Sequence, residues 1–139
     1  MTEAGPLAKL AESLRQPPFH EFLGLELVDA DREAGSATLR MPFRREFQRS
    51  PTHPQLHGGV IAALIDIAGD YALAAVLGGG VPTINIRVDY LRPAADTALT
   101  ASARVVRQGK SIGVVDIEVF DDEARLIAVG RGCYSTKIG

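Results

Sequence analysis

The sequence has a single cysteine, Cys133, among its 139 residues. An intrachain disulfide and a metal cluster built on cysteines are therefore excluded, and a reduced, cytoplasmic setting is the expected one. The chain also lacks a basic patch interleaved with aromatic side chains, because its net charge is −2 and charges of both signs are mixed along it. We therefore do not expect nucleic acid as a partner.

The sequence shows no sign of a targeting or membrane segment. The stretch "MTEAGPLAKLAESLRQPPF" lacks the basic and then apolar layout of a signal peptide. The apolar run over residues 61–77 is interrupted by Asp66 and Asp70, and charged side chains inside a membrane span are costly. We expect no membrane partner. Because no repeat or linker divides the chain, we expect one domain over residues 1–139, with residues 1–18 as a helical extension.

The order of predicted elements indicates the fold class. Leucines at helical spacing predict a short helix over residues 6–14, which the prolines at 17 and 18 end. Alternation about the turn "DREAGS" predicts a hairpin over residues 23–43, and a long apolar helix follows over residues 58–77. Four runs rich in Val, Ile, Thr and Tyr come next: "TINIRVDYLRP", "TALTASARVVRQG", "SIGVVDIEVFDD" and "RLIAVGRGCYSTK". This order predicts an α+β fold in which a curved antiparallel sheet surrounds one long central helix.

The two carboxylates within the apolar helix require an explanation, because burying a charge is costly. At about 100° per residue, Asp66 and Asp70 share a face whose first turns carry only small residues, Gly59, Ala62 and Ala63. A solvent-facing side of the helix explains the acids too, but such a face usually carries Lys, Glu or Gln. This face carries none, and small side chains allow a ligand or another backbone to approach closely.

The "HGG" at the start of this helix is the second notable feature. The first amides of a helix lack intrahelical acceptors and lie at the positive end of its dipole. At Gly58 and Gly59 no side chain covers those amides, so an anion or a carbonyl oxygen that gains negative charge is a suitable ligand. The other interpretation is that the two glycines only form a tight turn into the helix.

Helix geometry limits how these two features can cooperate. Gly58 and Asp66 are eight residues apart, which corresponds to roughly 12 Å along the helix axis. The side chain of an aspartate spans only a fraction of this distance. If both groups act on one reacting carbon, they come from two antiparallel copies of the helix, and the enzyme is at least a dimer.

The segment "LHGGVIAALID" resembles the signature of the hotdog-fold acyl-CoA thioesterases of the PaaI-like and thioesterase superfamily member 2-like family. The segments "PTINIRVDYLRPA", "VVRQGKSIGVVDIEVFD" and "LIAVGRG" are similar to the later strands of that family. The resemblance covers residues 20–137. It implies hydrolysis of an acyl-CoA thioester to a free acid and coenzyme A by a homodimer or homotetramer, without a metal or other cofactor.

The resemblance also implies roles for individual residues. Asp66 corresponds to the catalytic carboxylate, as a nucleophile or as a general base on water. Gly58 corresponds to the backbone donor that polarises the thioester carbonyl, and His57 to the residue that supports this loop. Thr83 lies where many relatives have a Ser or Thr near the attacking water.

One position departs from the family pattern. Many relatives have Asn or Gln six residues before the histidine, and this chain has Pro51, which has no side-chain amide. Gln55 or His53 replaces that helper, or both have an ordinary loop role. Asp70 either reaches a polar group across the dimer or has its pKa raised by the neighbouring acid. Lys110 is a candidate for the phosphates of coenzyme A, as are three arginines: Arg87, Arg92 and Arg131.

Two other functions remain open from the sequence. A hotdog hydratase or dehydratase uses a His and an acid in one site, but the His-x-Pro-Gly motif of the acyl-carrier-protein dehydratases is missing here. A non-catalytic acyl-CoA binding or sensor protein would not need Asp66, although the departure at Pro51 is compatible with it.

Overall fold

A computed structural model of the chain, which describes residues 4–137, contains one antiparallel sheet of six strands in the order β1-β2-β4-β5-β6-β3. Its strands are β1 (Glu26–Asp31), β2 (Ser36–Met41), β3 (Thr83–Tyr90), β4 (Leu99–Gln108), β5 (Ile112–Asp121) and β6 (Leu126–Ser135). The four strands predicted after the long helix and the hairpin before it are all confirmed. Strand β3 lies at one end of the sheet, where it pairs with β6 alone within the described residues.

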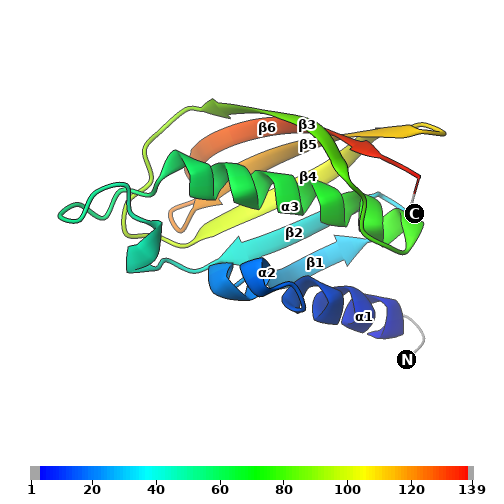
Figure 1. Ribbon diagram of the computed structural model, residues 1–139, viewed down its shortest axis with the longest axis horizontal. Helices are drawn as coiled ribbons and strands as arrows, with labels where there is room; N and C mark the ends of the chain where they lie inside the picture. Colours follow the sequence, from blue (N-terminus) through cyan, green and yellow to red (C-terminus); the bar gives the residue numbers. More distant parts are fainter. Residues whose placement is uncertain (1–3, 138–139) are drawn as a thin grey trace.

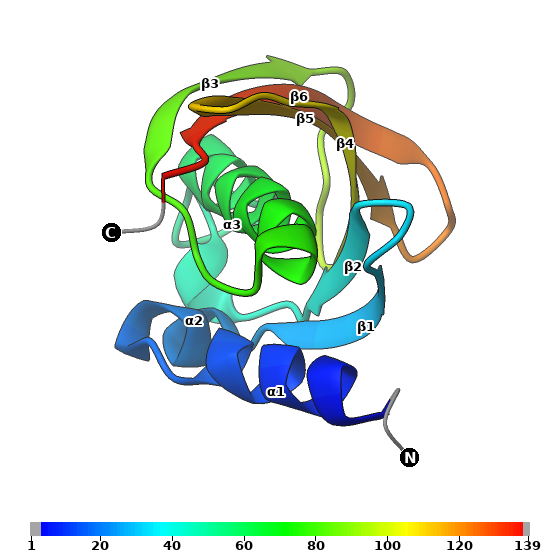
Figure 2. The same ribbon diagram turned by 90° about the vertical axis from the view of Figure 1, so that its right-hand side faces the viewer.

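The sheet curves around a single helix of 20 residues, α3 (Gly58–Leu77), as Figures 1 and 2 show. The concave face of the sheet and the apolar side of α3 share one core, in which Leu64, Ile65 and Ala72 have no exposed surface. Burial of this surface is the main stabilising contribution. By length and composition α3 could cross a membrane, but it is the core helix of this fold. The predicted hotdog architecture, α+β with one central helix, is therefore confirmed.

The N-terminal segment is helical over a longer range than the sequence predicts. Helix α1 (Ala4–Arg15) is followed by a second short helix, α2 (Pro18–Leu23), which the sequence analysis did not predict. Proline at the first position of a helix needs no N–H acceptor and has a suitable φ, so the "PP" that ends α1 also begins α2. A single 3₁₀ turn, η1 (Arg45–Phe47), lies in the loop before α3.

The two N-terminal helices close the open side of the sheet beside α3 and β1 (Figure 2). Leu14 of α1 is fully buried in the common core, and the hydroxyls of Ser13 and Tyr71 are 3.3 Å apart. His20 Nδ1 donates to the Leu14 carbonyl at 2.8 Å, which connects α2 to α1. Of the predicted extension, residues 4–18 are described and contribute Leu14 to the common core, while residues 1–3 lie outside the described residues.

Helix α3 and strand β6 are in close contact at Gly69. A Cβ placed on Gly69 would lie 2.1 Å from the hydroxyl oxygen of Tyr134, a fully buried residue of β6. Because Gly69 has no side chain, Tyr134 reaches the helix and donates a hydrogen bond of 2.9 Å to the backbone carbonyl of Asp66. This contact fixes the middle of α3 against the sheet.

Candidate active site

The N-terminus of α3 has one free amide. His57 is the N-cap, and its Nδ1 accepts a hydrogen bond of 2.8 Å from the Gly59 N–H. Because Nδ1 is the acceptor, a neutral His57 carries its proton on Nε2. The Gly58 N–H has no acceptor among residues 4–137. Of the two glycine amides predicted to be open, only that of Gly58 is available for a ligand.

Tyr90, at the end of β3, also contacts this turn, and the sequence analysis did not identify it. Its hydroxyl donates a hydrogen bond of 2.7 Å to the Gly58 carbonyl. A Cβ on Gly58 would lie 3.3 Å from the Tyr90 ring, and one on Gly59 would lie 3.1 Å from His57 Nδ1. The "GG" therefore allows two side chains to lie close to the helix start, in addition to leaving an amide open.

Two turns further along α3, Asp66 is half-buried and contacts Thr83, the first residue of β3. The Thr83 hydroxyl donates a hydrogen bond of 2.7 Å to Asp66 Oδ1. Two residues to which the resemblance gave separate roles, Asp66 and Thr83, are therefore adjacent in the structure. Thr83 holds one carboxylate oxygen of Asp66, and Tyr134 holds the backbone carbonyl of the same residue. The Asp66 carboxylate therefore has a defined orientation.

Asp70, one turn after Asp66, contacts the loop that leads from α3 to β3. Its Oδ1 accepts a hydrogen bond of 2.9 Å from the Val81 N–H of the same chain. Burial raises the pKa of Asp70 from its usual 3.8 to about 6; the Val81 N–H opposes this shift, and the charge of Asp66 adds to it. Burial therefore contributes more to the raised pKa of Asp70 than the repulsion from Asp66 that the sequence suggested.

The face that carries the two acids is only partly open. Ala62 and Ala63 are half-buried, as are the acids, but Gly69 and Leu73 on the same side are buried against the sheet. The space predicted for a ligand beside Asp66 is therefore limited to the first half of the helix.

A groove of about 460 Å³ lies at the N-terminus of α3. Gly58, Gly59 and Tyr90 line it, together with Gln55 and the exposed Arg92. Gln55 therefore lies near the open amide, as a substitute for the helper missing at Pro51 would. His53 is exposed, and its Nδ1 accepts a hydrogen bond of 3.1 Å from the Gln55 N–H. In this chain His53 supports the loop backbone.

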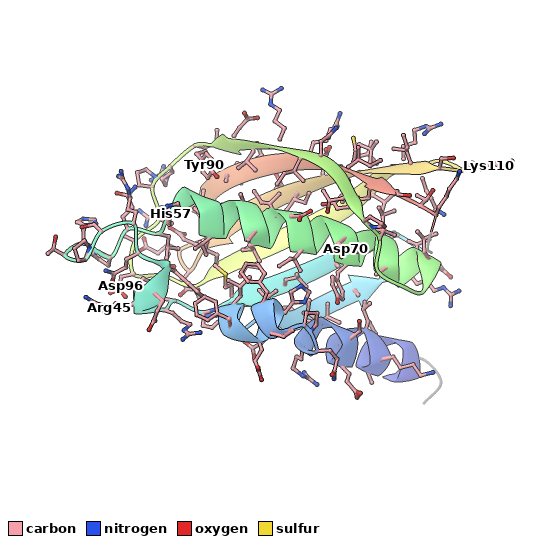
Figure 3. All side chains as sticks on the ribbon, viewed as in Figure 1. Arg45, His57, Asp70, Tyr90, Asp96 and Lys110 are labelled. Atoms are coloured by element: carbon pink, nitrogen blue, oxygen red, sulfur yellow. The ribbon has the colours of Figure 1, made fainter. Side chains whose placement is uncertain are left out.

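The other charged candidates lie elsewhere. Lys110 is at the end of the molecule opposite His57 and Tyr90, in the turn between β4 and β5 (Figure 3). Arg87 and Arg131 each pair with an aspartate of the sheet. Within one chain, only Arg92 of the predicted phosphate ligands is near the open amide. Among residues 4–137 no three His, Cys, Asp or Glu side chains are grouped as a metal site would require.

The structure retains the separation predicted along α3. The helix is continuous from Gly58 to Leu77, so the Gly58 amide and the Asp66 carboxylate of one chain are roughly 12 Å apart along the axis. One reacting carbon cannot contact both groups of a single chain.

Comparison with known proteins is consistent with this geometry. Residues 53–128 match the model of the thioesterase superfamily. The acyl-coenzyme A thioesterase PaaI of Escherichia coli is 36% identical over 124 residues, which are 84% of this chain and 80% of PaaI. The medium/long-chain acyl-CoA thioesterase YigI of the same organism is 29% identical over 134 residues, 84% of each chain.

Solved structures agree over nearly the whole chain. The structure of E. coli PaaI has a TM-score of 0.84 at 29% identity and covers 97% of this chain and 95% of PaaI. An X-ray structure of another thioesterase-superfamily protein has a TM-score of 0.88 at 34% identity, with 94% and 98% covered. None of these relatives is named as a hydratase or as a sensor, the two other functions considered from the sequence. This chain belongs to the thioesterase superfamily and is a hotdog-fold thioester hydrolase.

Proposed function

We propose that this protein hydrolyses acyl-CoA thioesters to a free acid and coenzyme A, in sites shared by two copies of the chain. The observation that carries the proposal is the pair of groups on α3: a Gly58 amide that has no acceptor within the described part of the chain, and an oriented carboxylate at Asp66. Acyl transfer from a thioester requires these two functions, a donor to the oxyanion and a nucleophile or base. Two relatives are named acyl-CoA thioesterases, which supports coenzyme A as the thiol.

Each group has a role in the reaction. The thioester oxygen accepts a hydrogen bond from the Gly58 N–H, where the helix dipole favours the negative charge that develops. Asp66 either attacks the thioester carbon, expelling the thiolate and leaving an anhydride for water to cleave, or removes a proton from the attacking water. In both routes the C–S bond breaks, water supplies the oxygen of the new acid, and the departing thiolate takes up a proton of that water to give the thiol of coenzyme A. Thr83 holds Asp66, and the resemblance assigns this position to a residue near the attacking water.

The free edge of the sheet supports a dimer. The unpaired edge of β3 can pair with a second copy, and a long exposed edge normally requires such cover. Thr83 at one end of β3 binds Asp66, and Tyr90 at the other end binds the Gly58 carbonyl. Antiparallel pairing of β3 with its copy brings the Thr83 end of one chain next to the Tyr90 end of the other. The carboxylate and the amide that one chain keeps apart would then meet across the twofold axis.

The decisive experiment measures release of free coenzyme A from aryl, short-chain and long-chain acyl-CoA by the wild type and by Asp66→Asn. The wild type should turn over at least one class, and Asp66→Asn should fold and assemble normally but lose on the order of 100-fold or more in kcat, because the nucleophile or base is gone. Asp70→Asn is the matched control one turn away and should lose far less.

Two outcomes would contradict the proposal. A kcat of Asp66→Asn within about threefold of the wild type would show that Asp66 is not the catalytic carboxylate. A wild type that releases no coenzyme A from any of the three classes would exclude acyl-CoA as the substrate.

The absence of a metal or cofactor, the cytoplasmic location and assembly into tetramers remain predictions.

A further inference from the structure

We propose that Tyr90 is a positioning residue for thioester hydrolysis: its hydroxyl fixes the first peptide of α3 so that the Gly58 N–H stays directed at the thioester oxygen. This inference rests on the function proposed above. Tyr90 does not touch the reacting atoms in this assignment. It acts through the backbone beside the amide that does.

The geometry of the Gly58–Gly59 peptide carries the inference. Both polar atoms of this peptide are held by side chains: Tyr90 donates to its carbonyl at 2.7 Å, and His57 Nδ1 accepts from its N–H at 2.8 Å. The preceding amide, that of Gly58, has no acceptor among residues 4–137. The structure therefore immobilises the peptide adjacent to the free donor, as expected where a donor must be preorganised.

The bond from Tyr90 is not needed to satisfy the carbonyl. In an α-helix the first carbonyl already accepts the N–H four residues further on, and this turn is open to water. In the single chain Tyr90 is 53% exposed, so without this bond its hydroxyl would be hydrated. The hydroxyl instead donates to the backbone carbonyl of Gly58, 32 residues earlier, and this bond connects the start of α3 to the end of β3. The ring also lies against Gly58, where a Cβ would lie 3.3 Å away, which prevents the turn from moving in that direction.

The bond has an electrostatic effect as well. Tyr90 O–H, the 58–59 peptide and His57 Nδ1 form one hydrogen-bonded chain, and such chains polarise their members. His57 and Tyr90 thus act on the same peptide from opposite ends, and Figure 3 shows both at the N-terminal end of α3. The resemblance assigned the support of this loop to His57 alone, and the structure adds Tyr90.

The test is Tyr90→Phe, which keeps the ring over Gly58 and removes only the hydroxyl. We expect kcat to fall about fivefold, which is the change in rate that corresponds to a hydrogen bond worth about 1 kcal/mol. KM should stay within about twofold, because the amide acts mainly in the transition state. Tyr71→Phe is the matched control: it also removes one hydroxyl hydrogen bond, to Ser13, at a site remote from the amide, and should leave kcat unchanged.

A spectroscopic measurement separates positioning from packing. In the Asp66→Asn background an acyl-CoA binds without turnover, and the infrared C=O stretch of the thioester reports the hydrogen bond it accepts. Adding Tyr90→Phe should move this stretch toward its value in water, while the thermal midpoint and the dimer content stay unchanged.

The proposal is overturned if Tyr90→Phe has wild-type kcat, or if the C=O stretch does not move. It is also overturned if activity falls only in proportion to a loss of folded protein, because Tyr90 would then be a packing residue of the β3 end. In each of these cases the proposed function is still supported, provided that the wild type is active and the Asp66→Asn variant is inactive. An inactive wild type contradicts the proposed function itself.

Discussion

Complementation between two inactive variants tests directly whether the site is shared between chains. Asp66→Asn removes the carboxylate, and Gly58→Val obstructs the amide with side-chain atoms. Any Cβ at position 58 already lies 3.3 Å from the Tyr90 ring, so the branched side chain of valine displaces the ring, the turn or the substrate carbonyl. Each homodimer is expected to be inactive, with kcat reduced on the order of 100-fold.

The expected recovery follows from the roughly 12 Å between the two groups along α3. In a mixed dimer one site combines an intact Gly58 with an intact Asp66, and the other site has both lesions. Random association of equal amounts makes about half of the dimers mixed, so the mixture should recover about a quarter of wild-type activity. Mixed dimers purified through a different tag on each chain should recover about half.

The assay is release of coenzyme A by the separate variants, by the mixture and by the purified mixed dimers. Circular dichroism and sedimentation must first show that each variant folds and dimerises. Mixed dimers that are well folded yet as inactive as their parents would refute the reasoning, because Gly58 and Asp66 would then not meet across the interface. Recovery in a sample that is monomeric by sedimentation would refute the shared site as well.

Two further predictions concern α3. Gly69→Ala places a Cβ 2.1 Å from the buried Tyr134 hydroxyl, so it should lower the free energy of unfolding in urea by about 2 kcal/mol despite the better helix propensity of alanine. Gly5→Ala, on α1 with nothing within 4 Å, should be neutral or stabilising, and an equal loss there would contradict the packing explanation. Asp70 has a pKa raised from 3.8 to about 6, so the folded state binds the proton of this acid more tightly than the unfolded state does. The stability that the protonated acid contributes is therefore lost as the pH rises from about 4 to 6. Asp70→Asn should therefore raise the free energy of unfolding by up to about 3 kcal/mol at pH 8 and leave it unchanged at pH 3.5. If urea titrations show the same effect of the substitution at both pH values, burial is not the cause of the raised pKa.

Several features of the site could be predicted because they depend on short stretches of sequence. The helix start at "HGG" and the face that carries Asp66 follow from local propensity and from the fixed period of a helix. The distance between Gly58 and Asp66 follows from the same period, and it is unchanged in the structure. The resemblance singled out Thr83 as a residue near the attacking water, but only the structure shows its hydroxyl donating a hydrogen bond of 2.7 Å to Asp66.

Other features could not be predicted, because they join residues that the curvature of the sheet brings together. Tyr90 is 32 residues from Gly58, and Tyr134 is 68 residues from Asp66. Such contacts depend on strand order, register and twist, for which a single strand carries no signal. The second short helix was missed for a different reason, since "PP" was interpreted only as a stop and proline is also favoured at the start of a helix.

The sequence by itself determined the central helix, the six strands, their order along the chain and the separation of the amide from the carboxylate, because each of these depends on local backbone geometry. The tertiary structure decided which groups from other elements support α3. It placed Thr83 on Asp66, attached Asp70 to the loop after α3, and placed Tyr90 on the first peptide of the helix. The reason is physical: a helix defines the positions of its own residues to within an ångström, whereas the partners of those residues come from strands whose positions are set only when the sheet closes around it.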